Sequence, residues 1–152
     1  MSLKLPKMQI LKLPELMKAA KQLQAMGSTQ KTANNLFYLN IDDNYIHQLF
    51  PLLNDEEIKK PDYFAEKSAG AHITITYPEE NKSIRKNDLQ QEHSFVIKNI
   101  VAAEIGTKTY YAILVDSPSL LQLRRKYKLP DLLNFKGYSI GFHITIGYKI
   151  LS

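Results

Sequence analysis

A chain of 152 residues with 44% hydrophobic content is large enough for one domain, or for one domain built from two small lobes. The absence of cysteine excludes disulfides, thiolate nucleophiles and zinc–cysteine sites, and it is compatible with the cytoplasmic location that we expect. No apolar stretch approaches the roughly 20 residues of a membrane-spanning helix, so we expect no membrane partner. The formal net charge of +5 favours ligands that carry phosphate, although charge alone discriminates weakly.

The first predicted element is an amphipathic helix. Apolar residues recur at helical spacing over residues 14–26, and Pro14 suits the first turn. Residues 28–34 are polar and predict a loop. We therefore expect residues 1–34 to form an N-terminal helical extension and residues 35–152 to form a single bilobal domain.

Two strands with a helix between them follow. Residues 36–41 (LFYLNI) predict a strand, and Asp42 and Asp43 are candidate N-caps of the helix after it. The charged residues 54–69 predict short helical turns and loop. Residues 71–77 (AHITITY) predict a β-branched strand.

The second half of the chain repeats this order. Residues 94–105 and 109–115 predict an antiparallel hairpin joined by a Gly-Thr-Lys turn. Ser117 and Pro118 are typical of an N-cap and a first helical position. Residues 142–150 (FHITIGYKI) predict the last strand.

Each half is thus a strand–helix–strand unit that ends in His-Ile-Thr-Ile. Because side chains alternate along a strand, His72 and Thr74 share one face, and so do His143 and Thr145. The isoleucines between them point into a core. A repeat of both architecture and chemistry predicts two similar lobes that face each other across a cleft.

The two motifs suit chemistry at phosphorus. One imidazole takes a proton from the attacking water or hydroxyl, and the other donates a proton to the leaving alkoxide. The threonine hydroxyls donate hydrogen bonds to the non-bridging oxygens. Gly147, with the same parity as Thr145, would let a ligand approach the strand closely. This scheme requires no metal and no other cofactor.

The sequences HITI at 72–75 and HITI at 143–146 resemble the paired H-x-[ST]-h signatures of the 2H phosphoesterase superfamily, in which h is hydrophobic. That group includes LigT-like RNA ligases and phosphodiesterases and cyclic phosphodiesterases. The resemblance covers residues 35–150. It implies a bilobal α+β fold in which antiparallel sheets flank a central cleft.

The resemblance also implies roles. His72 and His143 would be the catalytic acid and base, and Thr74 and Thr145 would bind the phosphate. We expect a monomeric, metal-independent phosphodiesterase that acts on a nucleotide or RNA phosphodiester, either a 2′,3′-cyclic phosphate or a 2′-5′ linkage. The alternatives are a hydrolase of cyclic oligonucleotide signals and a non-catalytic module that binds nucleotides or RNA. Which histidine is the base stays open.

Further candidates for substrate binding are less specific. Tyr77 and Tyr148 follow the two motifs at the same offset, on the face opposite the histidines if the strands stay regular. Core packing is their default, and base stacking is the alternative. Lys149 has the parity of the catalytic face and is a candidate phosphate contact. Tyrosines on the first strand of each half could also line the cleft: Tyr38, Tyr110 and Tyr111.

The remaining histidines and the basic run at 124–128 are expected to have structural rather than catalytic roles. His47 is expected on a helix surface, and His93 is expected to be exposed. A metal site that joins His93 to the motif histidines is disfavoured, because no metal-binding spacing is present. The basic run at 124–128 indicates a solvated helix face, with a phosphate or RNA contact as the alternative.

Overall fold

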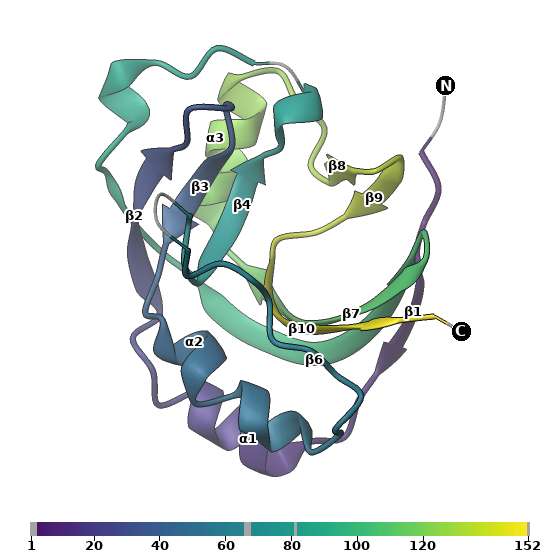
Figure 1. Cartoon of the computed structure of the whole chain (residues 1–152). Helices are drawn as coiled ribbons and strands as arrows, with labels where there is room; N and C mark the ends of the chain where they lie inside the picture. Colours follow the sequence, from purple (N-terminus) through teal and green to yellow (C-terminus); the bar gives the residue numbers. More distant parts are fainter. Residues whose placement is uncertain (1–2, 66–67, 81, 152) are drawn as a thin grey trace.

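The computed structural model, which describes residues 3–65, 68–80 and 82–151, contains two four-stranded antiparallel sheets and a separate hairpin (Figure 1). The first sheet has the order β1–β6–β7–β10, formed by Lys7–Ile10, Val96–Ile105, Lys108–Asp116 and His143–Ile150. The second has the order β4–β3–β2–β5, formed by His72–Thr76, Phe37–Asn40, Met26–Lys31 and Glu92–Ser94. The hairpin pairs β8 (Leu133–Phe135) with β9 (Tyr138–Ile140).

Short helices lie outside the sheets. They are α1 (Pro14–Ala20), α2 (Asn44–His47) and α3 (Pro118–Lys126), with 3₁₀ turns at Phe50–Leu53, Pro78–Glu80 and Lys86–Asp88. In Figure 1, α3 lies behind the second sheet, and α1 and α2 lie together at one end of the molecule. The expected α+β class with antiparallel sheets is confirmed, whereas the pseudo-symmetry of two lobes stays a prediction. None of the helices in the described part of the chain is long and apolar enough to cross a membrane.

Most of the predicted elements are confirmed. The strands expected at 36–41, 71–77, 109–115 and 142–150 are β3, β4, β7 and β10. The turn between β6 and β7 contains Gly106 at φ +62°, in the left-handed region that favours glycine. Ser117 caps α3, because its hydroxyl oxygen accepts a hydrogen bond from the N–H of Leu120 at 3.4 Å.

The expected helical extension over residues 1–34 is wrong in its secondary structure. The helix α1 ends at Ala20, and the predicted loop at 28–34 instead contributes most of β2, which lies between β3 and β5. β2 gives no hydrophobic signal, because its buried residue is Thr29, whose hydroxyl donates to the carbonyl of Asp88 at 2.6 Å. Since β1 pairs with β6 as well, this segment contributes one strand to each sheet.

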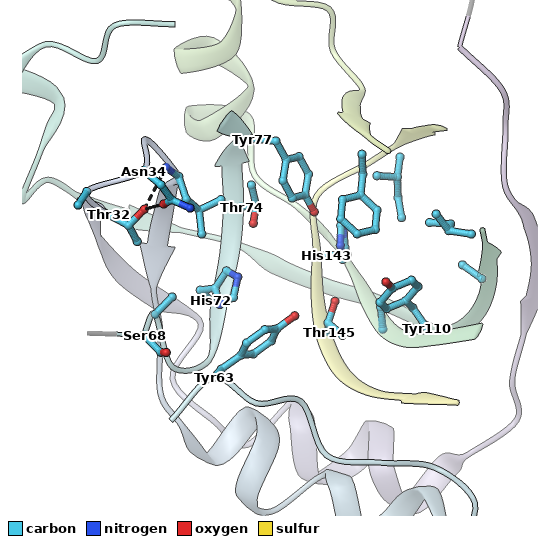
Figure 2. Close-up of a pocket in the computed structure, with 18 residues that line it drawn as sticks. Thr32, Asn34, Tyr63, Ser68, His72, Thr74, Tyr77, Tyr110, His143 and Thr145 are labelled. Atoms are coloured by element: carbon cyan, nitrogen blue, oxygen red, sulfur yellow. Dashed lines mark hydrogen bonds between the residues drawn. The ribbon is translucent and has the colours of Figure 1, made fainter. Parts of the chain in front are cut away.

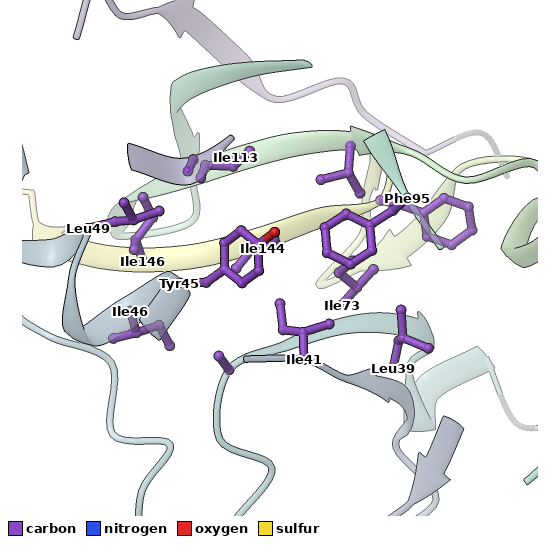
Figure 3. Close-up of a cluster of buried hydrophobic side chains, with 14 of the residues drawn as sticks. Leu39, Ile41, Tyr45, Ile46, Leu49, Ile73, Phe95, Ile113, Ile144 and Ile146 are labelled. Atoms are coloured by element: carbon purple, nitrogen blue, oxygen red, sulfur yellow. The ribbon is translucent and has the colours of Figure 1, made fainter. Parts of the chain in front are cut away.

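The core joins the two sheets. Ile73 and Ile75 of β4 and Ile144 and Ile146 of β10 are all 0% exposed, so the predicted inward direction of these isoleucines is confirmed. Figure 3 shows Ile144 across from Ile41 and Ile73, next to Tyr45 of α2, and Ile146 across from Ile46 of α2. All four motif isoleucines belong to one continuous apolar cluster. The two motif strands are therefore held by the same core.

Arg124 of α3 is buried rather than solvated. Its guanidinium is 0% exposed and forms a two-pronged ion pair with Glu80, at 2.9 and 2.8 Å. The remaining N–H groups donate to the carbonyls of Ile75, Pro130 and Leu132 at 2.8 to 2.9 Å. All five guanidinium donors are thereby used. The expected solvated face applies to Arg125, whose side chain is 61% exposed, and is wrong for Arg124.

Replacing Arg124 by methionine tests this buried pair. The Arg124→Met variant leaves the Glu80 carboxylate buried without its cation, so the free energy of unfolding should fall by about 3–5 kcal/mol. Urea denaturation followed by circular dichroism measures the change. Arg125→Met removes a neighbouring but exposed ion pair and should leave the denaturation midpoint almost unchanged. Equal effects of the two substitutions would contradict the structural role of Arg124.

Candidate active site

The two motifs line one cavity. This cavity has a volume of about 510 Å³ and is bordered by both sheets, by the β8–β9 hairpin and by loops (Figure 2). His72 and Thr74 enter it from β4, and His143 and Thr145 enter it from β10. The structure thus brings together two pairs of side chains, although the two motifs that carry them lie about 70 residues apart along the chain.

The two histidines are held in the same way. Nδ1 of His72 lies 2.7 Å from the carbonyl oxygen of Gly70, and Nδ1 of His143 lies 2.8 Å from that of Gly141. A carbonyl only accepts, so Nδ1 carries the proton in each ring, and Nε2 is left with a lone pair in the neutral imidazole. Either ring can therefore take a proton at Nε2 and later return it.

The supporting glycines extend the repeat to Gly-x-His-Ile-Thr-Ile, at 70–75 and 141–146. This longer repeat is visible in the sequence and distinguishes both glycines from the others in the chain. Gly70 has φ +67°, and a Cβ there would lie 2.7 Å from Oδ1 of Asp43. Asp43, expected as an N-cap, makes no side-chain cap to α2 and instead accepts the N–H of Ala71 at 3.0 Å. The turn before β4 is therefore fixed by glycine and by this carboxylate.

Both motif strands contain a β-bulge at the same position. In β4, Thr74 pairs with Tyr38 and Thr76 with Phe37, so Ile75 has no partner residue of its own. In β10, pairing likewise passes from Thr145 to Gly147 and omits Ile146. An extra residue reverses the alternation of faces beyond it. Residues four or more positions past each histidine consequently exchange faces relative to a regular strand.

The bulge in β10 overturns the expectations for Lys149 and Gly147. Lys149 is not among the described residues that line the cavity, and its ammonium pairs with Asp55 at 3.2 Å and Glu57 at 3.5 Å. A Cβ on Gly147 would lie 2.6 Å from Cγ2 of Ile58. The space beside this glycine is filled by an apolar side chain, so it does not admit a ligand.

The bulge in β4 has the opposite effect on Tyr77, which lines the cavity despite its odd offset. Tyr148 pairs with the cavity-lining Tyr110 and so lies on the cavity side of the sheet, but it is not among the described lining residues. Tyr38 is not among them either. Its ring contacts His72 edge-on, with centroids 5.6 Å apart. Tyr111 pairs with Gly147 on the other face.

Sequence reasoning missed two aromatic residues of the cavity. Tyr63 lies in the charged stretch expected to be loop, and its ring meets His72 edge-on at 4.8 Å between centroids. Phe135 of β8 packs against Tyr77 at 4.9 Å and Tyr110 at 5.6 Å. Neither position carries a periodic signal, because Tyr63 lies in no strand or helix and β8 has only three residues.

The other two histidines lie outside the cavity lining as described. Nδ1 of His93 lies 2.8 Å from the hydroxyl of Ser119, and Nδ1 of His47 lies 2.8 Å from the ammonium of Lys60. Within the part of the chain that the structure describes, no three His, Cys, Asp or Glu side chains gather in a metal-binding arrangement.

Among the described lining residues, the two histidines are the groups that can gain a positive charge near neutral pH. The described lining includes no lysine, arginine, aspartate or glutamate. Burial lowers the pKa of His72 below the ordinary imidazole value, and the hydrogen bond to Gly70 opposes this only in part. Burial also lowers the pKa of His143, and a positive charge on His72 lowers it further. Both rings are therefore mainly neutral at pH 7 in the free protein.

A comparison with protein families agrees with this arrangement. Residues 37–151, which contain both motifs, match the family model described as Swiss Army Knife, 2H phosphoesterase domain. The chain belongs to this family. No curated protein and no solved structure matches the chain significantly. This 2H phosphoesterase is accordingly an enzyme that acts on phosphate esters.

The burial of His72 and His143 leads to a prediction about their pKa values that NMR can test. The ring resonances of His72 and His143 should titrate with pKa values below 6.5, because desolvation disfavours the imidazolium. His72→Gln should raise the pKa of His143, since it removes the second positive charge. His93→Gln, a change outside the cavity lining, should leave that pKa unaltered. A pKa of His143 that is the same in the wild type and in His72→Gln would show that the rings are not coupled.

Proposed function

We propose that this 2H phosphoesterase is a metal-independent phosphodiesterase that hydrolyses a nucleotide or RNA phosphodiester, either a 2′,3′-cyclic phosphate or a 2′-5′ linkage. The observation that carries the proposal is the matched pair of imidazoles in one cavity, each with Nδ1 bound to a carbonyl and Nε2 left for the substrate. A site for simple anion binding has no need of two groups that both exchange protons near neutral pH.

The reaction needs one proton taken and one given. A neutral imidazole of the pair removes a proton from water at Nε2 while the water oxygen attacks phosphorus. The protonated imidazole gives its Nε2 proton to the ester oxygen whose bond to phosphorus breaks. The hydroxyls of Thr74 and Thr145 donate hydrogen bonds to the non-bridging oxygens, where negative charge is held in the transition state. The products are a phosphomonoester and a free ribose hydroxyl.

The shape of the cavity supports a small substrate or a chain end. A volume of about 510 Å³ falls within the range of roughly 300–1,000 Å³ that is typical of small-molecule sites. The lining combines aromatic residues with the polar loop residues Thr32, Asn34 and Ser68. This arrangement suits a nucleotide, which joins an apolar base to a polar sugar phosphate.

Activity assays with single histidine variants test the proposal. With 2′,3′-cyclic AMP as substrate and EDTA present, His72→Ala and His143→Ala should each lower kcat/KM by about 10²- to 10⁴-fold, the usual contribution of a general acid or base. His93→Ala lies outside the cavity lining and should retain wild-type kcat/KM. A panel with 2′-5′ oligoadenylate and cyclic dinucleotides separates the candidate substrates. Tight binding without any product would instead identify a non-catalytic binding module.

The pH dependence of kcat/KM should be bell-shaped with an acidic optimum. Activity rises with pH as the base loses its proton and falls as the acid loses its proton. The pKa of His72 and the pKa of His143 are both lowered from 6.5. The two apparent pKa values that define the rise and the fall of the profile should therefore both lie below 6.5. Initial rates at low substrate concentration between pH 4.5 and 8.5 measure the profile. An optimum above pH 7 would contradict the assignment of both groups.

A further inference from the structure

The face of the first sheet that lines the cavity continues beyond it. Ala103 of β6 and Tyr110 of β7 are paired and both line the cavity, and Tyr148 of β10 pairs with Tyr110 on its other side. Tyr148 in turn pairs with Lys59 through two backbone hydrogen bonds, of 2.7 and 3.0 Å. Residues directly opposite each other in an antiparallel pair share a face. This row therefore extends the cavity face outward to Lys59.

Three lysines surround the two tyrosines of this row. Lys108 lies two residues before Tyr110, on the same face of β7, and its ammonium lies 4.9 Å from the ring centroid of Tyr148. Lys136 lies in the turn of the β8–β9 hairpin, and its ammonium lies 3.3 Å from the hydroxyl of Tyr110. In Figure 1 this turn lies on the side of the molecule where β7 begins and β10 ends. We call these five residues the lysine–tyrosine strip: Lys59, Lys108, Tyr110, Lys136 and Tyr148.

The strip is accessible, and its positive charges are not neutralised. Lys59 and Lys136 are exposed, and the other three members are half-buried. Within the part of the chain that the structure describes, none of the three ammonium groups forms an ion pair with a carboxylate. Glu79 accepts the backbone N–H of Lys136 rather than its ammonium. Cations and aromatic rings are thus both available to a ligand beside the cavity.

We propose that the lysine–tyrosine strip binds the single-stranded part of an RNA whose 3′-terminal phosphodiester lies in the cavity; the inference rests on the proposed function. The enzyme then acts on RNA ends in preference to mononucleotides. Tyr110 and Tyr148 stack on unpaired bases, and the lysines neutralise the phosphates that join them. Because a tyrosine ring stacks on any base, the strip selects for chain length rather than for sequence.

The dimensions of the sheet separate the strip from the reacting phosphate. Lys108 lies four residues along β7 from Ala112, which pairs with the motif residue Thr145. At about 3.4 Å per residue, this separation is about 14 Å. A phosphate at the motif threonine and a phosphate at Lys108 are therefore different groups of one chain. A mononucleotide that fills the cavity leaves the strip empty, and a longer RNA gains its contacts.

The lysines change partners when the RNA binds. In the free protein the ammonium of Lys108 lies over the ring of Tyr148, and that of Lys136 lies 5.9 Å from the ring centroid of Tyr110. A phosphate is a stronger partner for an ammonium than an aromatic ring is. Each lysine side chain therefore turns to a phosphate, and the ring that it leaves is free to stack on a base. The free protein holds the cations in place until then.

The length of the substrate tests the strip. We compare kcat/KM for triadenylate that ends in a 2′,3′-cyclic phosphate with kcat/KM for 2′,3′-cyclic AMP, since the same bond breaks in both. The wild type should prefer the longer substrate by about 10-fold or more, the effect of base stacking on tyrosine. Tyr148→Ala should lower this ratio by about 10-fold, mainly through KM. Lys108→Gln and Lys136→Gln should each lower it by about 3-fold or more, because each removes a phosphate contact.

A lysine on the opposite face of the same sheet is the matched control. The exposed Lys7 of β1 pairs with Glu104, and Glu104 pairs with Thr109, the neighbour of Tyr110 on the other face. Lys7→Gln removes the same charge and should leave the ratio unchanged. Equal kcat/KM for the two substrates in the wild type would overturn the inference. A ratio that falls equally in Lys7→Gln and Lys108→Gln would also overturn it, by showing attraction to the net charge alone.

Binding without turnover keeps this inference separate from the proposed function. Fluorescence anisotropy with labelled single-stranded pentaadenylate measures the association constant at several salt concentrations. The slope of its logarithm against that of the salt concentration should be less steep by about 0.7 in Lys108→Gln and in Lys136→Gln, the value for one phosphate contact on a single strand. In Lys7→Gln the slope should not change.

The two proposals fail in different ways. If no diester is turned over but these slopes are found, the phosphodiesterase proposal fails and the RNA-binding role of the strip stands. If pentaadenylate does not bind, or binds no better than an adenylate–uridylate duplex of the same length, the role of the strip is overturned whatever the turnover. A duplex offers no unpaired bases to Tyr110 and Tyr148, so equal binding would exclude stacking.

Discussion

The isoleucines of both motifs pack into a single apolar core, and this packing determines where the histidines point. Ile73 and Ile144 follow His72 and His143 directly, and both are 0% exposed. Because alternate residues of a strand occupy opposite faces, burying these isoleucines turns each histidine away from the core. The two motif strands belong to different sheets that share this core, so their polar faces border the same cavity. The hydrophobic effect thereby positions the two histidines of the proposed acid–base pair.

The β-bulges explain which inferences from the sequence held and which failed. The faces of His72 and His143 were predictable, because the alternation needed only the two residues on either side of each isoleucine. The orientation of Lys149 was not, since an extra residue at 146 shifts the pairing and composition gives no sign of it. β2 was missed for another reason: its buried position is a threonine satisfied by a partner 59 residues away in sequence. Long-range partners of this kind are invisible to local periodicity.

The buried Glu80–Arg124 pair connects the fold to the cavity. The bulge at Ile75 takes that residue out of the regular pairing with β3, and its carbonyl accepts a hydrogen bond from Arg124 at 2.9 Å. Glu80 binds the N–H of Tyr77 at the end of β4 and that of Asn134 in β8. A buried polar cluster has to be satisfied throughout, because each unpaired member would be costly. The same ion pair therefore holds the bulge, a cavity tyrosine and the hairpin that borders the cavity.

The electrostatics of the cavity tie proton uptake to substrate binding in the proposed mechanism. In the free protein, burial disfavours the imidazolium of both His72 and His143, so the pair is mainly neutral at pH 7. A phosphodiester brings one negative charge into a cavity whose described lining has no fixed cation. That charge favours the protonated form of a nearby imidazole, and the proton shared by the pair stabilises the bound anion in return. Binding of the substrate thus favours protonation of the imidazole that acts as the general acid. The second ring, made less basic by its protonated neighbour, stays neutral and can act as the base.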